Sequence, residues 1–177
     1  MITGPVGGGK SFTGRALTDE LQRRGCKAAV IDLDQVYGFV RQIDGVDDDA
    51  AWQMARSGAA ALSTEFFDKA ISTVIVEGEF FTPEELGALL GPIAADVRRD
   101  IYTLKVSYET AWKRVQGDPT RGISKNPAFL KSMSVKFERA LTFLSGVSTV
   151  VEADALSPAE IVGELVGRLG RHEKLSS

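Results

Sequence analysis

The sequence predicts an α/β protein built on a parallel β-sheet. Five short segments rich in Val and Ile alternate with longer segments in which apolar residues recur three or four positions apart. This alternation is typical of parallel strands joined by crossover helices. A glycine-rich stretch that ends in Gly-Lys-Ser follows the first apolar segment, as in loops that bind phosphate. No repeat or linker interrupts the pattern, so we expect one domain over residues 1–177.

Composition narrows the class of protein. The chain is 44% apolar and 25% charged, with a formal net charge of −3, which is ordinary for a globular protein and does not suggest nucleic-acid binding. A single cysteine, Cys26, excludes an intramolecular disulfide and fits a reducing compartment. No apolar stretch approaches the length of a membrane span. We expect a cytoplasmic monomer or homodimer that binds neither membrane nor nucleic acid.

The first elements are a strand, a helix and a second strand. Only Met1-Ile2-Thr3 precede the glycine-rich loop, whereas a buried strand usually has roughly four to eight residues. Either this strand is unusually short, or further residues precede it. A helix is expected from Ser11, ending at Gly25, where a left-handed residue is favoured. Residues 28–34 read as a buried strand that carries two carboxylates at its carboxyl end.

The rest of the chain continues the alternation. A loop or short helix is expected over residues 35–48. A long helix follows over 49–71, and the acids at 47–49 mark its start, with a metal site as the alternative. The remaining strands are expected at 72–77, 100–106 and 147–152. The remaining helices are expected at 82–90, which begins with a capping box and a proline, at 108–116, at 129–144, and after Ser157.

Residues 4–11, GPVGGGKS, match the phosphate-binding pattern G-x-x-x-x-G-K-[ST] between a strand and a helix. Glycines let successive amides point at phosphate oxygens, and the helix start adds positive charge. Lys10 would reach the β- and γ-phosphates, and the hydroxyl of Ser11 would hold Mg²⁺. The expected nucleotide contacts are Gly4, Pro5, Val6, Gly7, Gly8, Gly9, Lys10, Ser11 and Phe12.

Three carboxylates lie at expected strand ends. Asp32 and Asp34 are two positions apart, so on a regular strand both side chains face the same side. One carboxylate could then bind the metal ion or its water, and the other could accept the proton of an attacking hydroxyl group. Glu77 ends the next strand and could hold Mg²⁺ through water. The alternatives are solvated acids at the end of the strand, and for Glu77 a capping or salt-bridged acid.

Residues 117–128 are rich in glycine, proline and basic residues, which predicts a mobile surface segment. Arginine that closes over a transferring phosphoryl group stabilises its charge. We therefore expect a lid here, with Arg121 as a catalytic residue and Arg114 as a second nucleotide contact. The alternative is a solvated basic loop. The acceptor is expected to contact Asp34 and an aromatic wall with polar partners, namely Tyr37, Arg41, Trp52, Arg56 and Phe80. The alternative for most of the aromatic residues is a place in the core.

These motifs resemble the small P-loop kinases of the shikimate kinase, gluconate kinase and chloramphenicol phosphotransferase type. The matching stretches are GPVGGGKS at 4–11, DLD at 32–34, VIVEGEFF at 74–81 and RVQGDPTRG at 114–122. One departure is Glu77-Gly78-Glu79, where shikimate kinases carry a glycine triplet.

The resemblance implies a three-layer P-loop fold with a five-stranded sheet in the order 2-3-1-4-5. It also implies ATP as donor, Mg²⁺ as cofactor, and a hydroxyl-bearing small molecule as acceptor. By this similarity Asp34 is the substrate-binding catalytic carboxylate and Asp32 is the magnesium-side acid. The alternative function is a nucleotide-binding regulatory protein that hydrolyses ATP slowly and has no acceptor.

Overall fold

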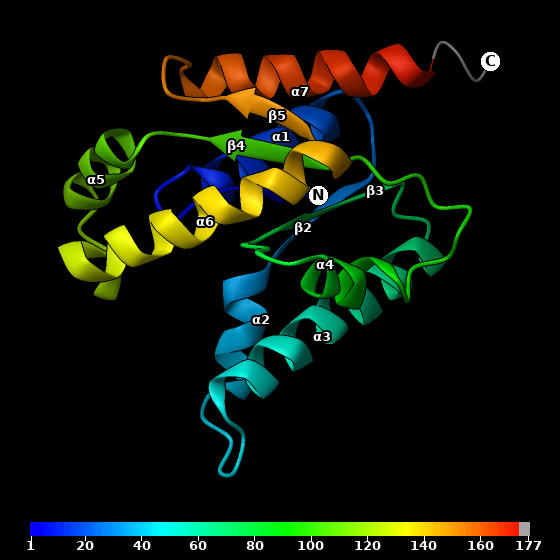
Figure 1. The fold of residues 1–177 in the computed structure, drawn as a ribbon. Coiled ribbons are helices and arrows are strands. Elements are labelled where there is room, and N and C mark those ends of the chain that lie inside the picture. The colour runs from blue at the N-terminus through cyan, green and yellow to red at the C-terminus, as the bar shows by residue number, and fades with distance from the viewer. Residues whose placement is uncertain (174–177) are drawn as a thin grey trace.

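The structure is a computed structural model that describes residues 1–173. Within these residues a parallel sheet has the strand order β2-β3-β1-β4-β5, which confirms the expected order (Figure 1). The strands are β1 (Ile2–Thr3), β2 (Ala28–Asp32), β3 (Thr73–Glu77), β4 (Tyr102–Lys105) and β5 (Thr149–Glu152). The helices are α1 (Lys10–Arg23), α2 (Leu33–Val40), α3 (Asp48–Asp68), α4 (Pro83–Leu90), α5 (Tyr108–Gly117), α6 (Pro127–Val147) and α7 (Pro158–Glu173), with a 3₁₀ helix, η1, at Ile123–Lys125.

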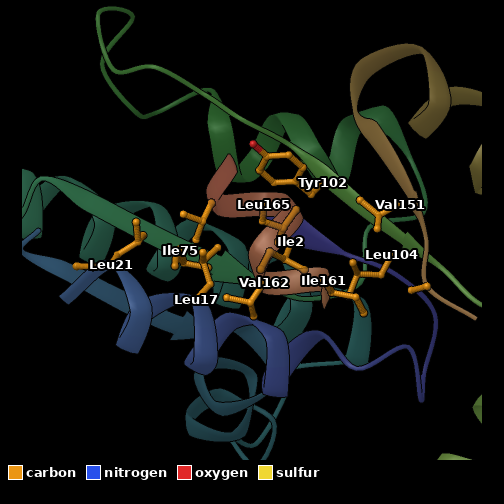
Figure 2. Packing of buried hydrophobic residues seen from close by; sticks show 13 residues of the cluster. Ile2, Leu17, Leu21, Ile75, Tyr102, Leu104, Val151, Ile161, Val162 and Leu165 are labelled. Atoms are coloured by element: carbon orange, nitrogen blue, oxygen red, sulfur yellow. The ribbon is translucent and has the colours of Figure 1, made fainter. Parts of the chain in front are cut away.

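Helices cover both faces of the sheet, because side chains alternate between the two faces along each strand. On one face, residues of α1 and α7 such as Leu17 and Leu165 pack against Ile2 and Ile75 of the central strands (Figure 2). On the other face, α3 and α4 pack against a separate cluster that includes Val76. The arrangement is the predicted three-layer α/β fold.

Side-chain caps fix where the helices begin. Asp47 accepts a hydrogen bond from the amide of Ala50, so the acidic run at 47–49 starts α3, as expected. Thr82 caps α4 by accepting from the amide of Glu85. Asn126 caps α6 by accepting from two amides of its first turn.

The second strand is shorter than predicted. β2 ends at Asp32, and α2 begins at the next residue, so Asp34 lies in the first turn of a helix. The carboxylate of Asp32 accepts from the amide of Asp34 at 3.0 Å and so acts as the N-cap of that helix. The prediction that both acids lie on one strand and face the same side is therefore wrong, because the cap bends the chain between them.

The segment expected as a lid contains some regular structure. α5 ends at Gly117, η1 occupies Ile123–Lys125, and α6 begins at Pro127, so the last two residues of the expected segment belong to a helix. Among residues 1–173, none of the helices combines the length and apolar character needed to cross a membrane.

Candidate functional site

The phosphate-binding pattern forms a tight loop between β1 and α1. Gly7 and Gly9 have φ values of +76° and +92°, in the left-handed region that favours glycine. A side chain at Gly7 would also lie 2.8 Å from the carbonyl oxygen of Ala111. The loop turns where the amide of Gly8 donates to the carbonyl of Pro5 at 2.9 Å. A glycine backbone of this kind, followed by a helix start, is suited to binding an anion.

Lys10, the first residue of α1, is buried and held from two sides. Its Nζ donates to the carbonyl oxygen of Pro5 at 3.0 Å and to Oε1 of Glu79 at 2.7 Å. Glu79 lies just after β3 and was not among the predicted site residues. The sequence does contain a signal for this residue, because Glu79 is a second acid that follows Glu77 just beyond the end of the strand. The ion pair places a carboxylate directly beside the cation expected to meet the phosphates.

The predicted metal-binding residues lie together. Asp32 and Glu77 are register partners at the ends of β2 and β3, which places their side chains side by side. Burial raises the pKa of Glu77 to about 7, a hydrogen bond with Ser11 acts in the opposite direction, and the nearby charge of Asp32 raises it further. Two adjacent carboxylates and a hydroxyl form an oxygen-rich cluster, and the nearby charge of Lys10 only partly offsets the effect of burial on Glu77.

This set fits Mg²⁺. The ion keeps several water ligands and is commonly held by one or two carboxylates together with substrate phosphates. In the described part of the chain no group of three or more acidic, histidine or cysteine side chains is arranged to hold a metal. The phosphates and water would therefore supply the remaining ligands beside Ser11, Asp32 and Glu77.

Asp34 faces the same region from α2. Asp34 as a whole is exposed, but neighbouring atoms remove part of the water around its carboxyl group. This desolvation raises the pKa of the carboxyl group. The negative charge of Glu79 raises the pKa further, and the positive charges of Lys10 and Arg121 lower it. The carboxyl group of Asp34 therefore interacts electrostatically with the lysine of the phosphate loop and with the arginine of the expected lid.

The aromatic residues predicted to contact the acceptor have different surroundings. Tyr37 and Trp52 stack with ring centroids 4.1 Å apart, and the hydroxyl of Tyr37 donates to Asp48, which raises the pKa of the tyrosine. Phe80 has no exposed surface and packs in the core between α3 and α4. Phe80 therefore stabilises the core in this structure, which is the alternative given for the aromatic residues, and a contact between Phe80 and an acceptor stays a prediction.

Arg56 projects from α3 into the same cluster. Its side chain is buried, forms an ion pair with Glu85 at 3.0 Å, and lies over the rings of Trp52 and Phe80. Burial lowers the pKa of the guanidinium, and Glu85 opposes that effect. The Nε atom has no hydrogen-bond partner among the described residues. The charge of Arg56 is thus already compensated within the protein.

The two predicted arginines have different partners. Arg114 of α5 donates to the carbonyl oxygens of Gly8 and Ala153, each at 3.1 Å, and so links the loop to the end of β5. Arg121 forms an ion pair with Asp118 at 3.1 Å. Phe12 is exposed on α1, and Arg41 is exposed after α2. Arg41 influences the pKa of Tyr37 but has no described contact with Asp34.

Three solved structures resemble the chain over nearly its whole length. A shikimate kinase from Acinetobacter baumannii in complex with shikimate has a TM-score of 0.68 at 16% identity, over 97% of this chain and 92% of its own. A sugar kinase from Janibacter sp. has a TM-score of 0.67 at 15% identity, over 96% and 92%. A gluconokinase from Sinorhizobium meliloti has a TM-score of 0.64 at 20% identity, over 99% and 95%. The fold is that of the small P-loop kinases. No family model and no curated protein matches the sequence.

In this P-loop kinase fold the carboxyl ends of the central strands meet around the phosphate loop. The structure brings together Lys10, Ser11, Asp32, Asp34 and Glu77, and adds Glu79 to them. Arg121 lies within electrostatic reach of this group. Tyr37, Trp52 and Arg56, three of the residues predicted to contact the acceptor, form a cluster next to Asp34.

Proposed function

We propose that the protein is an ATP-dependent phosphotransferase that moves the γ-phosphate to a hydroxyl group of a small molecule. The observation that carries the proposal is the position of Asp34, an exposed carboxylate that interacts electrostatically with Lys10 of the phosphate loop. A protein that only hydrolysed ATP slowly as a switch would have no use for a base on the acceptor side.

The proposed reaction assigns a separate role to each group of residues. Loop amides and Lys10 hold the phosphates, and the Ser11, Asp32 and Glu77 side chains hold the metal. Bound Mg²⁺ neutralises charge on the β- and γ-phosphates. The acceptor oxygen forms a bond to the γ-phosphorus while the bond from that phosphorus to the bridging oxygen of ADP breaks. Asp34 accepts the proton of the acceptor hydroxyl.

The segment over residues 117–128 is proposed as the lid. Arg121 would exchange its partner Asp118 for the oxygens of the transferring phosphoryl group, whose charge a guanidinium stabilises. The electrostatic interaction between Arg121 and Asp34 supports this role, because a charge that acts on the acceptor base is already close to the reacting groups.

The acceptor is proposed to be a neutral or amine-bearing polyol. Asp34 and Glu79 give the acceptor side two carboxylates, which bind hydroxyl and ammonium groups. Arg56, a buried cation of the neighbouring aromatic cluster, forms an ion pair with Glu85 and is not free to pair with an acceptor carboxylate. A hydroxy acid would add a negative charge beside Asp34 and Glu79, whose partners Lys10 and Arg121 are proposed to hold the phosphates. This preference separates the protein from an enzyme that selects an acid such as shikimate.

The test is ATP turnover with a panel of neutral polyols, amino polyols and hydroxy acids. We expect acceptor-dependent release of ADP with the first two groups, and a loss of at least about 10²-fold in the folded Lys10→Ala variant, since a charge contact in the transition state is removed. Slow ATP hydrolysis that no acceptor stimulates would support the regulatory alternative. Selective turnover of hydroxy acids would keep the kinase assignment and refute the acceptor class.

A further inference from the structure

Glu79 has a rigid support at the carboxyl end of the sheet. It follows the last residue of β3 by two positions, between Gly78 and Phe80. A side chain at Gly78 would lie 2.8 Å from Cβ of Leu33, so glycine is required for this segment to pass directly against the start of α2. On the other side Phe80 has no exposed surface. Packing therefore fixes the backbone on both sides of Glu79.

The same packing brings Glu79 towards Asp34. Leu33, which contacts Gly78, directly precedes Asp34 and has no exposed surface. The segments that carry the two acids are therefore in contact. Among the neighbouring charges, that of Glu79 has the largest effect on the carboxyl group of Asp34, whose pKa it raises. Glu79 and Asp34 thus act on the same space beside the phosphate loop.

The partner of Glu79 in the structure is an ammonium group. Nζ of Lys10 donates to Oε1 of Glu79 at 2.7 Å, and the side chain of Glu79 is only 16% exposed. A carboxylate with so little exposure is costly to leave without a cation. In the proposed function Lys10 contacts the phosphates, so another cationic group is needed beside Glu79 during the reaction.

Other cations of this region have contacts elsewhere. Arg56 forms an ion pair with Glu85 at 3.0 Å, and Arg121 forms one with Asp118 at 3.1 Å. Nζ of Lys136 in α6 lies 4.2 Å from the ring centre of Phe81. The bound substrate is therefore the source of positive charge that needs no rearrangement of these contacts.

We propose that Glu79 determines the specificity of the acceptor side by binding a protonated amine, and that the acceptor is an amino alcohol. This inference rests on the proposed phosphotransferase function. The ammonium group of the acceptor would take the position that the ammonium group of Lys10 has beside Glu79, while the acceptor hydroxyl faces Asp34. The amine keeps its protons. The hydroxyl oxygen bonds to the γ-phosphorus as the bond to the bridging oxygen of ADP breaks, and Asp34 accepts the hydroxyl proton.

An amine and a hydroxyl group differ in what they offer Glu79. A hydroxyl group donates one hydrogen bond, whereas an ammonium group also supplies the opposite charge. Exchange of the amine for a hydroxyl group should therefore lower kcat/KM about 10- to 100-fold, mainly through KM. N-acetylation of the amine removes its charge and should have a similar effect.

The experiment measures ADP release at saturating ATP and Mg²⁺ with matched acceptor pairs, namely serinol with glycerol and glucosamine with glucose. Further pairs are made from any acceptor of the functional panel that stimulates turnover. The readout is the ratio of kcat/KM within a pair. Effects of a substitution on Lys10, on Asp34 or on the amount of active protein are common to both members of a pair and cancel in this ratio.

We expect the wild-type protein to prefer the amine about 10- to 100-fold, and Glu79→Gln to reduce this preference to about 3-fold or less. Glu79→Asp keeps the charge and should retain part of the preference. The control is Glu84→Gln on α4, which removes one negative charge from an exposed position and should leave the ratio unchanged. In the wild-type protein the KM of the amine should also rise with pH as the acceptor amine loses its proton, while the KM of the hydroxyl analogue should not.

A preference for the amine that is equal in the wild-type protein and in Glu79→Gln would overturn this inference and leave the phosphotransferase proposal in place. The absence of any preference in the wild-type protein would also overturn it, because a cation of the chain, such as Lys136, would then neutralise Glu79. If no acceptor stimulates ADP release, the proposed function itself fails, and the inference fails with it.

Discussion

Asp32 and Asp34 are two residues apart, yet their carboxylates have different partners. Asp32 caps α2 and lies beside Glu77, whereas Asp34 lies in the first turn of α2 and interacts with Glu79, Lys10 and Arg121. The bend between the strand and the helix gives the two carboxylates different neighbours, although the charge of Asp32 still raises the pKa of Asp34. The proposed metal-side role of Asp32 and the proposed acceptor-side role of Asp34 are based on these neighbours.

We predict that Asp34→Asn lowers kcat roughly 10²–10⁴-fold with little change in ATP affinity, because the amide keeps the shape but cannot accept the proton. The matched variant Asp32→Asn should instead raise the Mg²⁺ concentration needed for half-maximal rate. Steady-state kinetics over a magnesium titration measures both effects. Full activity of the Asp34→Asn variant, together with loss of activity in the Glu77→Gln variant, would show that the general base is Glu77 at the end of β3 instead.

Single residues illustrate what the sequence could and could not predict at this scale. The pattern at 4–11 predicts the glycine-rich turn that the structure has, because its spacing reflects local backbone geometry. Glu79, the partner of Lys10, is far away in sequence, and only the register of β3 against β1 brings the two together. Phe80 and Arg56 were assigned to the acceptor by residue type, but burial, which depends on packing between helices, places them in or against the core.

At the level of elements, α1 and α3 end with the same hydrogen-bond pattern on different residues. Gly25 donates to Gln22 and Cys26 donates to Leu21, while Ala70 donates to Phe67 and Ile71 donates to Phe66. Both helices therefore finish with a residue in the left-handed region, where Gly25 has a φ of +86° and Ala70 a φ of +60°. Glycine adopts this conformation freely, whereas alanine is strained in it.

We predict opposite effects on stability for substitutions at these two positions. Ala70→Gly should stabilise the protein by about 0.5–1 kcal/mol, and Gly25→Ala should destabilise it by about 1–2 kcal/mol. Nothing lies within 4 Å of a side chain placed at Gly25, so its cost is purely conformational. Urea unfolding of both variants measures these changes. Destabilisation by both variants would show that the methyl group of Ala70 makes a packing contribution larger than its backbone strain.

The whole molecule has a stability that depends on pH through the amino group of Met1. Its pKa falls from 8.0 to about 6 on folding, so between these values the unfolded chain binds more protons than the folded chain. Stability should therefore rise with pH in this window, by about 1 kcal/mol between pH 7 and pH 8 for this group alone. Glu77, whose pKa is raised to about 7, contributes in the opposite sense up to that region.

The comparison of free and Nα-acetylated chains isolates the amine, because Glu77 is the same in both. Urea unfolding at pH 7 and pH 8 should give a stability that rises more steeply with pH in the free chain. Equal slopes would mean that the amino group is hydrated in the folded protein.

The architecture could be predicted from the sequence, whereas a cavity inside it could not. Alternating apolar segments predicted the α/β class, and the motif resemblance predicted the strand order that the sheet has. Only three residues precede the loop, which predicted a short β1, and β1 has two residues. A cavity of about 510 Å³ lined by residues of α1, α4 and β3 was not predicted. Such a space depends on distances between elements that no local pattern encodes.

The contact between Lys10 and Glu79 has a consequence for substrate binding. The ammonium group has three N–H donors, and two of them are directed at the carbonyl oxygen of Pro5 and at Glu79. In the proposed function the γ-phosphate would compete with Glu79 for this group. As Lys10 turns toward the phosphate it neutralises Glu79 less, so negative charge increases on the side proposed for the acceptor. ATP is therefore expected to lower the Kd of an acceptor that bears hydroxyl or ammonium groups.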